Sequence, residues 1–121
     1  MDIKDIKFRA KTLALHTWAE GDLLHKNGRT YIRKDKVIFA DVDPDTVCMF
    51  TGLKDCEGNE IWEGDILQDV DYYYIKYVVI FGEGTFFARK EGYYTGIPLH
   101  ECVGDLGNVT YAKVVGNKFD R

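Results

Sequence analysis

The stretch from Tyr72 to Phe81 constrains the fold most, because its odd-numbered positions are all apolar or aromatic, whereas Lys76 lies among the even-numbered ones. Alternation with a period of two places one set of side chains on each face of a β-strand. Gly82-Glu83-Gly84 then provides a turn into Thr85–Arg89, so we predict an antiparallel hairpin. The apolar face of the first strand is expected to carry Tyr73, Ile75, Tyr77, Val79 and Phe81.

A second hairpin is predicted around Asn27-Gly28, which separates two apolar runs. Both turn residues of such a hairpin need positive φ, which Asn and Gly tolerate best. No long segment shows a helical period, although Leu99–Leu106 is compatible with one helical turn as well as with a strand. The chain is therefore predicted to be mainly β, or β-rich α+β, with short antiparallel strands and hairpins. Further short strands are expected at 6–10, 37–40, 47–50, 99–103 and 109–115.

The length, composition and charge of the chain limit the number of domains, the cellular compartment and the kinds of partner that we expect. Its 121 residues, 45% hydrophobic and 30% charged, suit one compact domain over 1–121, or two subdomains at 1–48 and 49–121. The net charge of −4 argues against an extended phosphate-binding surface. Three cysteines, a charged N-terminus without an apolar signal region and no long apolar run indicate a reduced, cytoplasmic protein without a membrane segment.

A short internal similarity links Trp18–Leu24 with Ile61–Leu67, about 43 residues apart. Each segment contains Glu-Gly-Asp before an apolar run, and we interpret both as turns that lead into a strand. Recurring turn chemistry explains a seven-residue match better than a duplicated unit does.

The block from Thr51 to Ile66 (TGLKDCEGNEIWEGDI) carries the most specific pattern in the chain. It matches each fixed position of a family pattern, and on it the chain resembles the YopX family of phage and prophage proteins. The resemblance implies a small β-rich protein of a phage or prophage, with no activity assigned. The other matching blocks, in the family's order, are Ile6–Ala10, Trp18–Leu23, Val42–Val47, Val78–Phe86 and Val114–Asn117.

The residues of the family motif are interpreted as fold-making rather than catalytic. Glycines relieve turn strain, Asp55 can accept backbone hydrogen bonds across its turn, and Gly64-Asp65 begins the next strand. Gly-Asp before an apolar strand also occurs in SH3-like barrels, so such a barrel is one expectation for the C-terminal part. The motif residues are Phe8, Arg9, Thr51, Gly52, Leu53, Asp55, Gly58, Ile61, Trp62, Glu63, Gly64 and Asp65.

Candidates for catalysis or metal binding are weak, and we expect no enzyme activity, metal or cofactor. Asp41, Asp43 and Asp45 resemble the start of a calcium loop, but Thr46 stands where such a loop needs Gly. His100 and Cys102, with Cys48 or Cys56, lack zinc-ligand spacing and any group that would activate a thiolate. Glu63 and Asp65 are two carboxylates on one turn, where capping is the simpler role.

Two binding functions remain open. Aromatic residues beside cations can stack bases, and the predicted nucleic-acid face comprises Tyr72, Tyr74, Lys76, Arg89 and Lys90. The favoured alternative is protein association, because a small β domain rich in exposed aromatics often covers one face with another copy of itself. We therefore expect a homo-oligomer, or a complex with a host or phage protein.

Overall fold

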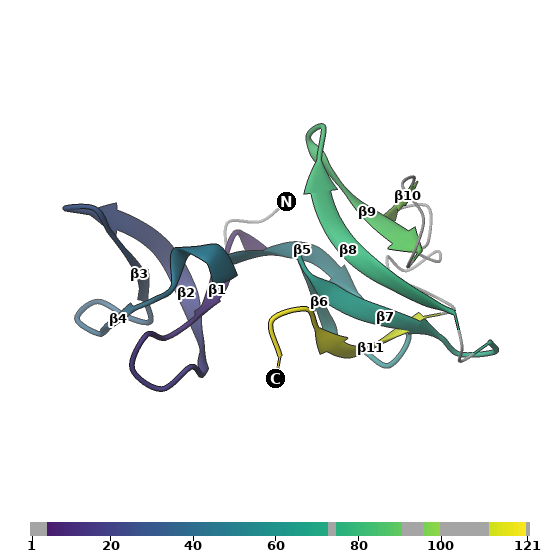
Figure 1. Ribbon diagram of the computed structural model, residues 1–121, viewed down its shortest axis with the longest axis horizontal. Helices are drawn as coiled ribbons and strands as arrows, with labels where there is room; N and C mark the ends of the chain where they lie inside the picture. The colour runs from purple at the N-terminus through teal and green to yellow at the C-terminus, as the bar shows by residue number, and fades with distance from the viewer. Residues whose placement is uncertain (1–4, 73–74, 91–95, 100–111, 121) are drawn as a thin grey trace. The chain divides into compact units, whose positions relative to one another are not determined.

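The computed structural model describes residues 5–72, 75–90, 96–99 and 112–120 (Figure 1). Nearly all of the regular structure is antiparallel β-sheet, which confirms the predicted class. The chain forms two compact units, residues 1–50 and 51–121. Whether the chain folds as one domain or as independent subdomains stays a prediction, and each unit is described by itself.

The first unit is a sheet with strand order β4-β3-β2-β1-β5. The predicted hairpin at Asn27-Gly28 is confirmed, since the two residues have φ of 54° and 76°. The elements are β1 (Phe8–Lys11), β2 (Trp18–Lys26), β3 (Arg29–Arg33), β4 (Phe39–Asp41), the 3₁₀-helix η2 (Pro44–Thr46) and the start of β5 (Cys48–Lys54).

The sheet of the first unit closes on itself. Thr12 forms an antiparallel bridge with Val42, so the end of β1 meets the chain just after β4. The N–H of Asp43 donates to the carbonyl of Lys11 at 2.9 Å, and the N–H of Leu13 donates to the carbonyl of Asp41 at 3.0 Å. The result is a small barrel whose interior is filled by few and mostly small side chains: Ala10, Ala19, Ile32 and Val42, with Phe8, Ala40 and Val47 packed against them.

The interpretation of Glu20-Gly21-Asp22 as a turn is wrong. These residues lie inside β2, where the strand changes its partner from β1 to β3. A Cβ atom on Gly21 would lie 2.1 Å from the carbonyl oxygen of Arg33, so only glycine lets the two strands approach this closely. Glu63-Gly64-Asp65, by contrast, is a turn, with φ of 84° at Gly64.

The second unit is built around a sheet with strand order β10-β9-β8-β7-β11. The predicted hairpin before Thr85 is confirmed, with φ of 51° at Glu83 and 79° at Gly84. Closure of these strands into an SH3-like barrel stays a prediction. The strands are the end of β5, β6 (Glu60–Trp62), β7 (Asp65–Asp69), β8 (Lys76–Gly82), β9 (Thr85–Lys90), β10 (Gly96–Pro98) and β11 (Ala112–Asn117). The core comprises Ile61, Leu67, Val79, Ala88, Leu99 and Ala112.

Several strand boundaries differ from the sequence prediction because a side chain stabilises a local turn. β8 begins at Lys76 and not at Tyr72, since the carboxylate of Asp69 accepts the N–H groups of Asp71 and Tyr72, each at 2.8 Å. β4 begins two residues later than predicted, since Asp35 accepts the N–H groups of Val37 and Ile38. The predicted strands at 99–103 and 109–115 lie in part outside the described residues.

Candidate binding surface

The outward face of the first unit gathers apolar and aromatic side chains from β2, β3 and β4. The register pairs Leu24 with Tyr31 and Arg33 with Phe39, and cross-strand partners point to the same side of a sheet. Ile32, one residue from Tyr31, points into the barrel interior. Leu24, Tyr31 and Phe39 therefore share the outer face, and 51% of Phe39 is exposed.

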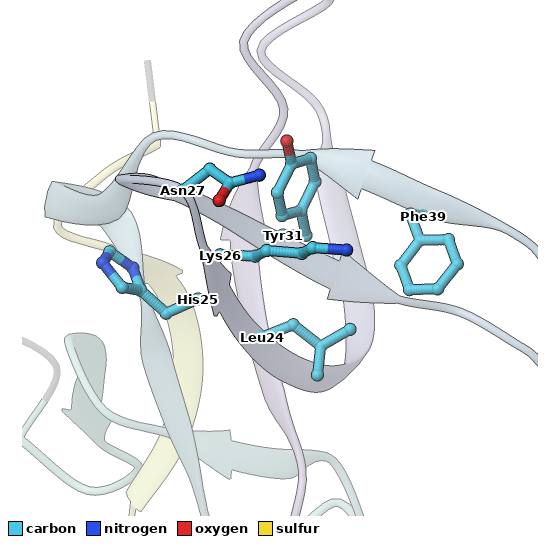
Figure 2. Close-up of a pocket in the computed structure, with 6 residues that line it drawn as sticks. All are labelled: Leu24, His25, Lys26, Asn27, Tyr31 and Phe39. Carbon is cyan, nitrogen blue, oxygen red and sulfur yellow. The ribbon is translucent and has the colours of Figure 1, made fainter.

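A shallow cavity of about 550 Å³ lies on this face. Figure 2 shows Leu24, Lys26, Tyr31 and Phe39 on one side of the hairpin, with Lys26 between the leucine and the tyrosine. His25 points to the opposite side, where its Nδ1 lies 3.2 Å from Oγ1 of Thr30. We call Leu24, Lys26, Tyr31 and Phe39 the Phe39 surface. The volume of the cavity falls in the range of small-ligand pockets, and the lining of the cavity combines apolar side chains with one cation, Lys26.

In and beside the strands that form the Phe39 surface, the arginines are ion-paired with carboxylates, whereas some lysines form no ion pair with a described residue. Arg29 pairs with Asp41 at 2.7 Å, and Arg33 pairs with Asp22 at 2.8 Å. Lys26, Lys34 and Lys36 are exposed and form no ion pair with any described residue. Residues 1–50 hold nine Lys and Arg against eight Asp and Glu, whereas residues 51–121 hold seven against twelve. Residues 1–50 thus carry a small positive net charge, whereas residues 51–121 are acidic.

The family residues Phe8 and Arg9 lie on opposite faces of β1. Phe8 packs against the core of the first unit, whereas Arg9 faces outward. The guanidinium carbon of Arg9 lies 4.4 Å from the ring centroid of Trp18, and Nζ of Lys11 lies 4.5 Å from it. A cation over an aromatic face is attracted by the ring quadrupole. Two cations thus lie against the ring of Trp18.

Asp55 is the hydrogen-bonding centre of the family block. Its side chain is 1% exposed. Its Oδ1 accepts the N–H groups of Glu57 and Asn59 at 2.9 and 2.8 Å. Its Oδ2 accepts the N–H of Val114 at 2.8 Å and Nδ2 of Asn59 at 3.2 Å. Burial opposes ionisation, but hydrogen bonds from Val114, Asn59 and Glu57 outweigh it and lower the pKa of Asp55. The carboxylate ties the β5–β6 turn to β11.

Asp65 plays a similar part at the next turn. Its Oδ2 accepts the N–H of Trp62 at 2.7 Å, and its Oδ1 accepts Nδ2 of Asn117 at 2.9 Å. The same amide of Asn117 also donates to the carbonyl of Glu63 at 3.2 Å. Gly64 leaves room for this contact, because a Cβ there would lie 3.2 Å from Asn117 Nδ2. Glu63 and Asp65 thus contribute to a turn anchored on β11.

The remaining motif residues surround these two turns. Thr51 donates its hydroxyl to the carbonyl of Ile61 at 2.7 Å and so joins β5 to β6. Gly52, expected in a turn, lies within β5 with φ of 83°. Gly58 has φ of 85° in the turn that Asp55 organises. Ile61 and Trp62 are buried, Leu53 packs against the core, and Ile66 is half-buried.

The five residues predicted to bind nucleic acid do not share one face. Lys76 and Val78 are two residues apart and lie on the same face of β8. Val78 is paired with Arg89, so Lys76 and Arg89 lie on the same face of the sheet. Lys90 is paired with Tyr77, which packs on the core side. Tyr72 lies in the turn before β8, and Tyr74 lies outside the described residues. A role for these residues in nucleic-acid binding stays a prediction.

Among the described residues, no group of three or more His, Cys, Asp or Glu side chains is arranged to hold a metal ion. Asp41 pairs with Arg29, and Asp43 accepts the N–H of Asp45. Cys48 is buried and Cys56 is exposed, whereas His100 and Cys102 lie outside the described residues. Desolvation, and after it the carboxylates of Asp55 and Glu57, raise the pKa of Cys56, which disfavours its nucleophilic thiolate.

The Phe39 surface was missed in the sequence analysis, although a signal for it exists. Counting outward from the Asn27-Gly28 turn pairs Lys26 with Arg29 and Leu24 with Tyr31. Phe39 joins them only because β4 returns alongside β3, a pairing that the local sequence does not specify.

These features define a mainly β protein with an apolar cavity on the outer face of its first unit and, in the described part of the chain, no metal cluster. A comparison with protein families matches residues 7–121 to the family described as YopX protein. The chain belongs to the YopX family, as the resemblance indicated. A search of curated proteins found no match. Within the described segments, no helix has the length and apolar character needed to cross a membrane.

Proposed function

We propose that this chain is a phage- or prophage-derived accessory protein that acts in the host cytoplasm by binding protein, and that it is not an enzyme. Its partner is another copy of itself or a protein of the host or phage. Membership of the YopX family supports the phage origin. The observation that carries the binding proposal is the Phe39 surface, where an exposed Phe39 and half-buried Leu24 and Tyr31, from three strands, line a cavity.

The surface has the composition expected of a protein-binding site. Interface centres are enriched in aromatic residues. Single exposed apolar side chains are common on protein surfaces, whereas a contiguous group of them marks an interaction site. The loop that leads into β4 adds to the group, since Val37 is 80% exposed and Ile38 is 50% exposed. Burying Phe39 and its neighbours against a partner would remove this apolar area from water.

The test is a comparison of Phe39→Ser with Val115→Ser, which removes a comparably exposed apolar side chain from the second unit. Molar mass is measured by light scattering after size exclusion, and both proteins are used as bait for host and phage lysates. We expect Phe39→Ser to lose association that the wild type and Val115→Ser retain. Equal behaviour of all three proteins would refute the proposal.

Nucleic-acid binding is a second candidate, and a specific feature favours it. Arg9 and Lys11 lie on one face of β1 beside Trp18, and cations next to an aromatic ring suit a single strand. Fluorescence anisotropy with labelled single-stranded and duplex DNA at low salt tests it. Absence of binding where electrostatic attraction is least screened would exclude this function.

A further inference from the structure

We propose that the Phe39 surface of one copy binds the turn Asp69–Tyr72 of a second copy, so that the protein assembles through a head-to-tail contact. The inference rests on the proposed function and names the partner of the same surface. We call residues Asp69–Tyr72 the Tyr72 turn. The two parts of the chain match in apolar exposure and in charge.

The receiving side is apolar with a positive rim. Phe39 and the preceding Val37 and Ile38 are each at least half exposed. Lys26 lies in the cavity wall between Leu24 and Tyr31 (Figure 2). Lys26 forms no ion pair with a described residue, and neither do Lys34 and Lys36, which follow in the loop between β3 and β4. A partner for this surface must combine apolar side chains with negative charge.

The Tyr72 turn has this composition. Apolar and acidic residues alternate in Asp69-Val70-Asp71-Tyr72, with Val70 46% exposed and Tyr72 55% exposed. Asp71 is exposed and forms no ion pair with a described residue. An exposed tyrosine ring on a turn can enter a shallow cavity, and the carboxylates beside it would meet Lys26.

The turn is also held in a defined conformation before any contact. Oδ1 of Asp69 accepts two backbone N–H groups, and the N–H of Ile75 donates to the carbonyl of Tyr72 at 2.8 Å. The N–H of Asp69 donates to the carbonyl of Ile75 at 3.0 Å and closes the loop. A preorganised turn loses less conformational entropy when it binds.

The charges favour a head-to-tail contact over a symmetric one. Two Phe39 surfaces placed face to face would oppose their unpaired lysines, and like charges across an interface are unfavourable. The acidic excess of residues 51–121 makes the second unit the better partner for the first. A head-to-tail contact is heterologous, so each copy uses both surfaces at once.

The test is a mixing experiment with Phe39→Ser and Tyr72→Ser, each of which alters an exposed side chain. We expect each variant alone to have the monomer mass of 13.9 kDa, while an equimolar mixture forms a 1:1 dimer that grows no further. The dimer forms because each variant supplies the surface that the other lacks. Val115→Ser should assemble like the wild type.

Other outcomes separate the two proposals. If Tyr72→Ser assembles like the wild type and Phe39→Ser does not, the named partner is wrong and the proposed function stands. If both variants behave like the wild type, both proposals fail. If the variants are monomeric alone and no dimer forms on mixing, the head-to-tail contact is refuted.

Charge exchange gives an independent test. Lys26→Glu or Asp71→Lys alone should weaken self-association about fivefold, and the double variant should recover most of the loss because the interaction is restored with reversed signs. A double variant no better than either single one would overturn the contact between the lysine rim and the Tyr72 turn.

Discussion

Replacing Asp55 with Asn should destabilise the second unit severely, although the two side chains have nearly the same shape. Each carboxylate oxygen of Asp55 accepts two N–H donors. An amide can satisfy one pair only, because its NH₂ group must then face the other pair of donors. The variant therefore loses two hydrogen bonds to a charged acceptor and buries donors without partners.

The size of the effect follows from these bonds. Hydrogen bonds to charged groups contribute about 1.5 to 3 kcal/mol each, so the loss of two predicts a decrease of at least about 3 kcal/mol in the free energy of unfolding. For a chain of this length, such a loss lowers the melting temperature by roughly 12 °C. Asp35→Asn is the matched control. Both N–H groups that Asp35 accepts bond to its Oδ1, so an amide oxygen there keeps both, and we expect a change below about 0.5 kcal/mol.

Urea unfolding followed by tryptophan fluorescence measures this change. Trp18 lies in the first unit and Trp62 in the second, so a Trp18→Phe background restricts the signal to the unit that contains Asp55. Asp55→Asn within 0.5 kcal/mol of its parent in that background would refute the structural role assigned to this carboxylate.

The effect should also depend on pH. The pKa of Asp55 in the folded protein is lowered, so its contribution is complete above the unfolded value of about 3.9 and is lost as the pH falls through the folded pKa. The stability difference between the wild type and Asp55→Asn should stay constant from pH 7 to about pH 5 and shrink below about pH 4. A difference that grows on acidification would contradict the argument.

Two further predictions concern single positions. Gly21→Ala should cost at least about 2 kcal/mol in urea unfolding, because its Cβ would overlap the Arg33 carbonyl, whereas Gly28→Ala meets no atom within 4 Å and should cost only about 1 kcal/mol for its positive φ. Equal losses would show that β2 does not approach β3 so closely. Cys56 should react with iodoacetamide at pH 8 more slowly than free cysteine, because its pKa is raised, and Glu57→Gln should accelerate it while Glu83→Gln does not. Peptide mass spectrometry measures this rate, and a Cys56 faster than free cysteine would contradict the raised pKa.

The predictable parts of the fold are those in which the signal is local. The turns at Asn27-Gly28 and Glu83-Gly84 depend on residues that tolerate positive φ, which the sequence displays directly. The turn after Asp55 was likewise expected, because a short acidic side chain can accept N–H groups two to four residues ahead.

The parts that were missed depend on contacts between distant residues. Gly21 resembled a turn glycine, but the atom that requires it is the carbonyl of Arg33, twelve positions away. Closure of the first unit depends on the bridge between Thr12 and Val42, whose partners lie thirty positions apart. The Phe39 surface was missed for the same reason, because three strands must assemble before it exists.

The central claim is that the chain acts by binding protein through the Phe39 surface, and the molar mass of the wild type in solution tests it most directly. Sedimentation equilibrium over a range of micromolar concentrations should give a mass above 13.9 kDa that falls to the monomer value for Phe39→Ser. A wild type that stays at 13.9 kDa at every concentration and captures no host or phage protein would contradict the claim.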